Sequence, residues 1–217
     1  LGLLLRLLKV QSIGFTIDEL QVMYHLKEMG WWNYISQSLS EADNHPPLTA
    51  TILALWMYVV PPIEVLIRLP FVILSACSVF FAYKVFGNWF SRRTALLICA
   101  FIACGNLPVL FGVYARPYGL ALTLLLFCLY QWDRTFNRSK PVPLSRGVGL
   151  GLSTLALFYT HYPSYFIALS LCLFSLACLK RNNLRVFFLA MGLATLGTLP
   201  YLHLSLQHAK NMHIGPN

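Results

Sequence analysis

Charged residues are scarce in this sequence. Asp, Glu, Lys and Arg make up only 11% of the 217 residues, and 58% are hydrophobic. Soluble domains have a charged share of about a quarter and an apolar share of about half. Because this chain has fewer charged and more apolar residues than a soluble domain, we expect an integral membrane protein.

Signatures of a bound metal or a redox pair are also lacking. The cysteines have no C-x-x-C spacing and all lie in apolar segments, so we interpret them as small packing residues (Cys77, Cys99, Cys104, Cys128, Cys172 and Cys178). His203, His208 and His213 are five residues apart, which does not place them on one helical face. The sequence therefore predicts neither a metal site nor a cofactor.

Long apolar runs recur along the chain. A helix needs roughly 20 apolar residues to cross a bilayer, and hydrocarbon offers no partner to an unpaired backbone group. We therefore predict an all-α fold, a polytopic transmembrane helical bundle that forms one module over residues 1–217. The expected spans are residues 1–16, 65–86, 94–112, 117–132, 147–162, 164–180 and 186–204. Arg6 and Lys9 count against the first span, and a start within an apolar run at Leu1 indicates a piece of a longer protein.

The basic residues indicate how the chain is oriented. A net charge of +9 would suggest nucleic acid in a soluble protein, but here Lys and Arg lie between the apolar runs, so no nucleic-acid partner is expected. The positive-inside rule places three clusters in the cytoplasm: Lys84, Arg92 and Arg93; Arg134, Arg138, Lys140 and Arg146; Lys180, Arg181 and Arg185. The turns at 105–116 and 160–163 then face outward, and we expect a location in the plasma (inner) membrane.

Residues 18–64 are expected to form an outer loop with interfacial and re-entrant helices. Its apolar stretch 48–60 is too short to cross a bilayer and is closed by Pro61 and Pro62. Nearly all acidic residues fall on this outer side (Asp18, Glu19, Glu28, Glu41, Asp43 and Glu64), and only Asp133 falls inside. Ionisable groups from distant segments thus converge at one membrane face, as an active site requires.

The strongest candidates for chemistry are Asp18 and Glu19, which follow an apolar run. A carboxylate at the membrane boundary can act as a general base with a pKa raised by partial burial. The alternative interpretation is an ordinary acid in the first turn of a helix. The dipeptide alone does not decide between the two.

Four basic residues are the candidates for contacting a phosphate. Arg116 opens a span, where a guanidinium beside a helix start suits a phosphate, but lipid snorkelling is an equal alternative. Arg68 has the same two interpretations. His45, at a proline-rich corner, is either a ligand for phosphate or sugar or an interfacial cap, and His161 is either a supporting site residue or a cap at a turn between helices.

Five short motifs, in order, resemble the C-type glycosyltransferases of the protein O-mannosyltransferase and lipid A aminoarabinose transferase group. They cover nearly the whole chain: Ile17-Asp18-Glu19, His45-Pro46-Pro47-Leu48, Arg68-Leu69-Pro70 in a segment ending Val85-Phe86-Gly87, Ala115-Arg116-Pro117-Tyr118, and Tyr159-Thr160-His161-Tyr162. The resemblance implies an outer-face site in which Asp18 is the catalytic base. The family usually carries an acid before the Ala-Arg pair, whereas this chain has Val113-Tyr114.

The activity implied is transfer of a sugar from a polyprenyl-phosphate donor to an acceptor hydroxyl, with inversion and without a divalent metal. Asp18 and Glu19 would be catalytic, Arg116 and His45 would bind the donor phosphate, and His161, Arg68 and Tyr118 would support the site. The partners would be the lipid-linked donor, a protein or glycolipid acceptor, and membrane lipids. The alternatives are a transporter or lipid flippase, whose sites tend to lie at mid-bilayer, and a non-catalytic membrane subunit.

Overall fold

The computed structural model describes residues 1–38, 45–136, 142–178 and 183–212. This part of the chain contains helices and no strand, which confirms the all-α expectation. The helices are α1 (Gly2–Val10), α2 (Ile17–Ser38), α3 (Leu48–Met57), α4 (Glu64–Trp89), α5 (Arg92–Cys104), α6 (Asn106–Val113), α7 (Pro117–Phe136), α8 (Leu144–Phe158), α9 (Ser164–Cys178) and α10 (Leu184–Met212). Several residues with predicted roles lie outside the described part: Glu41, Asp43, Arg138, Lys140, Lys180, Arg181 and His213.

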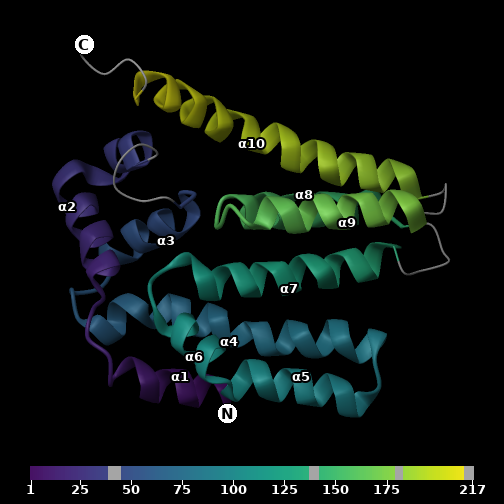
Figure 1. Cartoon of the computed structure of the whole chain (residues 1–217), viewed down its shortest axis with the longest axis horizontal. Helices are drawn as coiled ribbons and strands as arrows, with labels where there is room; N and C mark the ends of the chain where they lie inside the picture. Colours follow the sequence, from purple (N-terminus) through teal and green to yellow (C-terminus); the bar gives the residue numbers. More distant parts are fainter. Residues whose placement is uncertain (39–44, 137–141, 179–182, 213–217) are drawn as a thin grey trace.

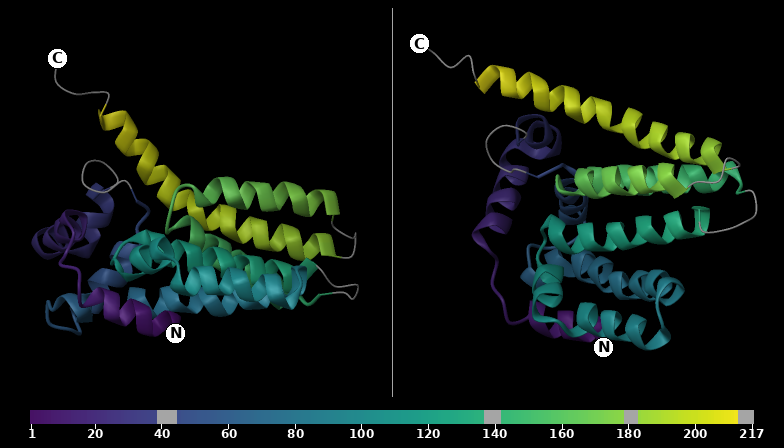
Figure 2. Two further views of the ribbon diagram at one scale, coloured as in Figure 1. Left: turned by 60° about the horizontal axis from the view of Figure 1, so that its bottom comes forward. Right: turned by 45° about the vertical axis from the view of Figure 1, so that its right-hand side comes forward.

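The long helices run side by side along one axis, whereas α2 crosses one end of the molecule with α3 beside it (Figure 1). Helix α4 packs against α5 and α7, and α8 packs against α7 and α10. Two further views show the same arrangement (Figure 2). The end that carries α2 and α3 is called the α2 end below.

Charge differs between the two ends. Asp18, Glu19 and Glu64 belong to the α2 end, where α1 leads into α2 and α4 begins. Arg92 and Arg93 lie at the opposite end, where α4 meets α5 (Figure 1). These three acids and the two arginines therefore lie at opposite ends of the bundle, and the end that carries Arg92 and Arg93 is called the basic end.

Among the described residues, two helices are individually long and apolar enough to cross a membrane: α4 over Glu64–Trp89, and α10 over Leu184–His203. Helices α5 and α6 form a third span only if they are counted together, because they meet at a bend of 49°. The prediction of one continuous span over 94–112 is therefore wrong. Helices α8 and α9 coincide with predicted spans but are shorter apolar helices.

The bend lies at Gly105, whose backbone is extended (φ −61°, ψ 140°) and whose N–H donates to the carbonyl of Phe101 at 2.7 Å. Pro108 follows in the first turn of α6, and because proline has no N–H it cannot continue the α5 hydrogen-bond ladder. The predicted outward turn over 105–116 is thus largely helix α6.

The first predicted span, 1–16, also differs from the structure. Helix α1 ends at Val10, and Arg6 within it is completely buried. The Arg6 guanidinium donates to the carbonyls of Ile102 (3.1 Å) and Ala103 (3.4 Å), two of the groups that the end of α5 leaves without a helical partner. Arg6 therefore caps the broken helix and does not face lipid.

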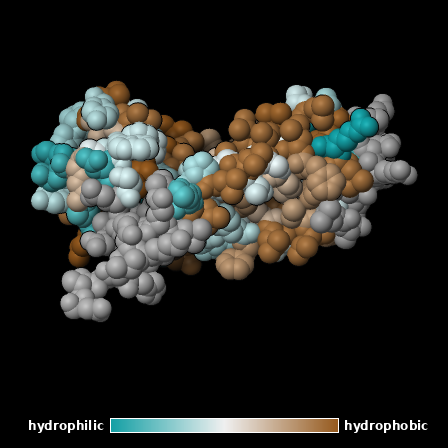
Figure 3. All heavy atoms as spheres, turned by 90° about the horizontal axis from the view of Figure 1, so that it is seen from above, coloured by the Kyte–Doolittle hydropathy of each residue, from teal (hydrophilic) through white to brown (hydrophobic). Residues whose placement is uncertain are grey.

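Hydrophobic side chains cover the outside of the bundle as well as its interior. On the face shown in Figure 3 they dominate the surface between the two ends, whereas strongly hydrophilic residues gather toward the ends. Exposed examples from three helices are Leu97 on α5, Phe166 on α9 and Leu196 on α10, with exposed fractions of 71%, 76% and 67%. Uncovered apolar surface of this extent is typical of a face that meets lipid or a partner.

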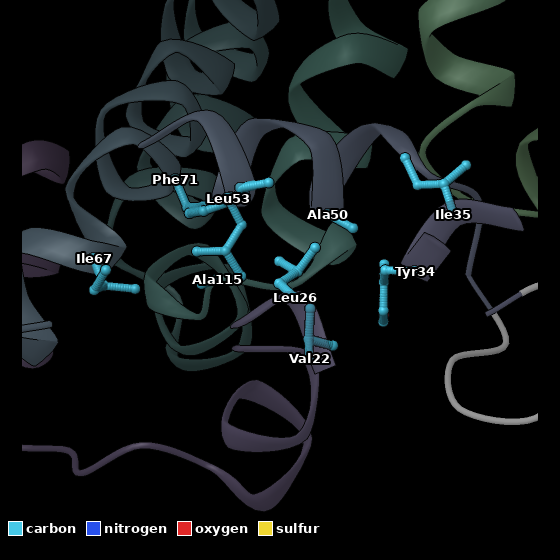
Figure 4. Close-up of a cluster of buried hydrophobic side chains, with 10 residues drawn as sticks. Val22, Leu26, Tyr34, Ile35, Ala50, Leu53, Ile67, Phe71 and Ala115 are labelled. Atoms are coloured by element: carbon cyan, nitrogen blue, oxygen red, sulfur yellow. The ribbon is translucent and has the colours of Figure 1, made fainter. Parts of the chain in front are cut away.

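At the α2 end, a buried hydrophobic cluster joins α2 and α3 to the bundle (Figure 4). Val22 and Leu26 of α2 pack with Leu53 of α3 and with Phe71 of α4, and Ala115 completes the cluster from the segment between α6 and α7. Helices α2 and α3 of the predicted outer loop 18–64 are therefore packed on the bundle. This packing fixes where α2 begins, which is the position of Asp18 and Glu19.

Candidate functional site

Glu19 and Arg68 form a completely buried ion pair at the α2 end. Arg68 donates from Nε to Oε1 of Glu19 at 2.8 Å and from Nη2 to Oε2 at 2.6 Å. The same guanidinium donates to the carbonyls of Ile13 (2.6 Å) and Gly14 (2.8 Å), and it lies over the ring of Phe15. Arg68 is therefore neither a snorkelling residue nor a free phosphate ligand, the two interpretations that the sequence suggested.

The remaining acceptor capacity of Glu19 is used by the backbone and by Thr16. The N–H and Oγ1 of Thr16 both donate to Oε2 at 2.9 Å, and the Glu19 N–H donates back to Thr16 Oγ1 at 3.2 Å. This reciprocal arrangement is a capping box that starts α2. The N–H of Ala115 donates to Oε1 at 2.8 Å. Glu19 thus connects the starts of α2 and α7 through helix α4.

These contacts set the ionisation of Glu19. Burial by itself would raise its pKa, because it removes water from the charged form. The hydrogen bonds from Arg68, Thr16 and Ala115, together with the charge of Arg68, outweigh burial and lower the pKa below its ordinary value. Glu19 is therefore a stable carboxylate with no vacant position for a substrate proton, and we assign it a positioning role.

Asp18 differs from Glu19 in its exposure and in its contacts. Its side chain is 65% exposed, and its Oδ2 lies 3.9 Å from Nη2 of Arg116, whose side chain is only 10% exposed. The arrangement follows from the buried contact beside it: Glu19 binds the backbone of Ala115, so the residues next in sequence, Asp18 and Arg116, are brought together. An open carboxylate and a fixed guanidinium thus share one site.

Three aromatic rings meet beside this pair. His45 stacks on His161 with ring centroids 5.6 Å apart, and both contact Tyr118, at 5.8 and 5.9 Å. They come from the segment before α3, the turn between α8 and α9, and the start of α7. Burial lowers the pKa of His161, because desolvation disfavours the imidazolium. Tyr118 lies two residues from Arg116 in the sequence, so the three rings meet near the start of α7.

An apolar groove of about 400 Å³ lies between α2 and α3 on one side and α8 and α10 on the other. Its walls include Trp31 and Leu48 from the first side and Leu152, Ala156 and Tyr159 from the second. The Leu48 N–H donates to the carbonyl of Tyr159 at 2.7 Å and so fastens the two sides together. The groove residues Pro47 and Tyr159 are two residues from His45 and His161 in the sequence, so the groove adjoins these rings.

Three features were not predicted from the sequence: the contacts of Thr16 and of Ala115 with Glu19, and the structural role of Arg6. Thr16 had a recognisable signal, because T-x-x-E before a helix is a capping-box pattern. Ala115 had none, since it acts through its backbone N–H. Asp133, the one acid predicted on the basic side, is also structural there: it accepts from Asn88 Nδ2 and Trp89 Nε1, both at 2.8 Å.

Within the part of the chain that the structure describes, no three His, Cys, Asp or Glu residues are grouped so that they could hold a metal ion. His203 lies on α10. The charges available at the site are therefore those of Asp18 and Arg116, with His45 and His161 beside them.

Comparison of the chain with known protein families, with curated proteins and with solved structures finds no match.

Proposed function

We propose that this chain is the membrane module of a glycosyltransferase that uses a polyprenyl-phosphate sugar. The observation that carries the proposal is the pairing of exposed Asp18 with largely buried Arg116 at the end of an apolar helical bundle. A general base and a fixed cation are the two groups that transfer from a sugar phosphate requires. The resemblance of the five motifs to C-type glycosyltransferases supports the same activity.

In the proposed reaction, an Asp18 carboxylate oxygen takes the proton of the acceptor hydroxyl as the hydroxyl oxygen attacks the anomeric carbon. The bond between the anomeric carbon and the phosphate oxygen breaks, and the electron pair leaves with the polyprenyl phosphate. Arg116 stabilises the negative charge on that phosphate. Because attack comes from the face opposite the phosphate, the anomeric configuration inverts.

The surrounding residues have positioning roles in this scheme. The buried Glu19–Arg68 pair holds the backbone beside Asp18 and Arg116 without contacting the substrate. His45 and His161 would contribute hydrogen bonds to the phosphate or the sugar. The apolar groove beside them has the volume and lining to seat isoprene units of the carrier. No step of this scheme requires a divalent metal.

The proposal includes a membrane topology. The chain would cross the plasma membrane several times, with the basic end in the cytoplasm and the α2 end outside. In the described part of the chain two helices meet the length and apolarity needed on their own, and the bent pair α5–α6 meets them when counted as one span. The others would cross as part of a packed bundle, with local thinning or tilt accommodating their length.

A transporter or flippase is the alternative, and buried Arg6 is the feature that favours it, since intramembrane charges often line transport paths. In this chain the Arg6 guanidinium is held by Ser75 Oγ (2.9 Å) and by backbone carbonyls, including that of Pro108 (3.3 Å). It therefore stabilises the helix break and does not line an open path. We accordingly favour the transferase.

The test is release of polyprenyl phosphate from a radiolabelled polyprenyl-phosphate sugar by the reconstituted protein. Asp18→Asn should lower the rate at least about 100-fold, since a general base contributes 10²–10⁴-fold, with little change in thermal stability because Asp18 is exposed. Glu28→Gln, which removes another exposed carboxylate of α2, is the matched control and should retain full activity. A folded Asp18→Asn protein with wild-type activity would contradict the proposal.

A further inference from the structure

A second pocket, of about 260 Å³, lies between α2 and α3. It forms where α2 breaks at Gly30, the one residue with a positive φ (+75°) in the described part of the chain. Lys27 and Trp31 of α2 and Tyr58 at the end of α3 line it. Trp31 also lines the apolar groove, so the two cavities are neighbours separated by one indole ring. Nothing in the proposed transfer uses this pocket.

Lys27 gives the pocket its charge. Its side chain is exposed, and it forms no ion pair with any residue in the described ranges. An ammonium group beside a tryptophan and a tyrosine is the combination found at the headgroup level of a bilayer, where long cations and amphipathic rings have one apolar and one polar end. The pocket therefore suits an anionic group attached to an apolar body.

The loop that follows the pocket presents apolar side chains to the outside. Tyr58, Val59 and Ile63 are 83%, 73% and 54% exposed. The loop is fixed at its base, because Trp56 Nε1 donates to the carbonyl of Leu66 at 2.7 Å. Helix α4, one of the two helices able to cross a membrane alone, begins directly after it at Glu64. These uncovered side chains therefore lie where a bilayer around α4 would begin.

We propose that the Lys27 pocket and the loop 58–63 together bind the headgroup of an anionic phospholipid. The Lys27 ammonium pairs with the lipid phosphate between Trp31 and Tyr58, and Val59 and Ile63 contact the upper part of the acyl chains. The proposal rests on the membrane embedding of α4 stated under the proposed function and not on transferase chemistry. This lipid would hold the α2–α3 unit at the membrane surface next to the groove.

Lipid binding to the purified, delipidated full chain would be measured by native mass spectrometry, with phosphatidylglycerol, phosphatidylcholine and inorganic phosphate as separate probes. Phosphatidylglycerol should bind about fivefold more tightly than phosphatidylcholine, the contribution of one lysine near an anionic surface. Lys27→Gln should abolish this preference, and Lys27→Arg should retain it. Lys84→Gln, which removes an exposed lysine near the opposite end of α4, is the matched control.

Two results of that titration would overturn the proposal. One is an unchanged preference for phosphatidylglycerol in Lys27→Gln. The other is displacement of the lipid by equimolar inorganic phosphate, which would make this a site for the free ion.

Spin labels separate this proposal from the membrane embedding itself. In a variant whose six cysteines are replaced by alanine, Val59→Cys and Leu97→Cys would be labelled in phosphatidylglycerol vesicles. Both labels should be more accessible to oxygen than to a water-soluble nickel chelate. If the label at 97 were in lipid and the label at 59 in water, only the lipid-binding proposal would be overturned. If both labels were in water, the membrane embedding would be refuted, and the proposed function depends on that embedding as well.

Discussion

Glu19 and Arg68 are joined by two hydrogen bonds, Nε to Oε1 at 2.8 Å and Nη2 to Oε2 at 2.6 Å, and neither side chain is accessible to solvent. Desolvation of two charges opposes folding, so such a pair is tolerated only when its other donors and acceptors are also satisfied. Here the backbone at Ile13, Gly14 and Ala115 satisfies them. The pair therefore acts as a junction between α2, α4 and the start of α7.

Breaking this junction from one side should be strongly destabilising. Glu19→Gln keeps the shape of the side chain but leaves Arg68 as a buried cation without a counterion, which costs about 3–5 kcal/mol. Thermal unfolding in detergent should show a large fall in Tm. Glu28→Gln should change the stability by less than about 0.5 kcal/mol because that side chain is exposed. The double variant Glu19→Gln/Arg68→Met should recover part of the loss, and a stable Glu19→Gln protein would refute the role of the pair.

Stability should also depend on pH through Glu19. Its pKa lies below the ordinary value of 4.5 in the folded protein, so between these two values the unfolded chain binds a proton that the folded chain does not. This contribution is fully present above about pH 4.5 and is lost as the pH falls through the lowered pKa. Unfolding midpoints measured from pH 7 to pH 3 should fall less steeply in Glu19→Gln than in Glu28→Gln. Equal slopes would contradict the assignment.

The cap that Arg6 provides for α5 predicts a second stability effect. Arg6→Met removes the donors that satisfy the carbonyls of Ile102 and Ala103 in the interior, and each buried acceptor left alone costs about 1–3 kcal/mol. Tm should therefore fall clearly, and amide exchange should increase around Gly105. Lys9→Met, at a partly buried position of the same helix that bonds to none of these carbonyls, provides the comparison. Unchanged exchange at the bend would show that Arg6 does not hold it.

The groove predicts a dependence on the length of the lipid carrier. Ala156→Phe would place a ring among the groove residues Leu152 and Tyr159 and reduce the space for isoprene units. The KM for a long-chain donor should rise roughly tenfold, equivalent to about 1.4 kcal/mol, with a smaller effect on a donor of two isoprene units. Leu169→Phe, at a 57% exposed position on α9, should change neither value. An equal effect on both donors would show that the groove does not bind the isoprene units of the carrier.

Several features followed from local sequence. The scarcity of charge and the long apolar runs predicted helices, and the T-x-x-E pattern at Thr16, although not used in the prediction, carried the start of α2, because hydrogen bonding and capping act over a few residues. No such local signal predicted that Glu19 is buried and Asp18 exposed. Adjacent residues on a helix point in directions about 100° apart, so which of them is buried depends on what packs against the helix.

The sequence by itself determined an all-helical, apolar chain, because composition and periodicity are properties of each segment alone. Only the tertiary structure decided that Arg68 is a buried partner of Glu19, that Arg6 caps a broken helix, and that Arg116 lies beside Asp18. Arg6, Arg68 and Arg116 are the same residue type, and each lies in or next to an apolar segment of the sequence. Their roles differ because each guanidinium bonds to the acceptors that folding brings near it, and apart from the Gly2 carbonyl that accepts from Arg6 these acceptors lie 49 to 102 residues away along the chain.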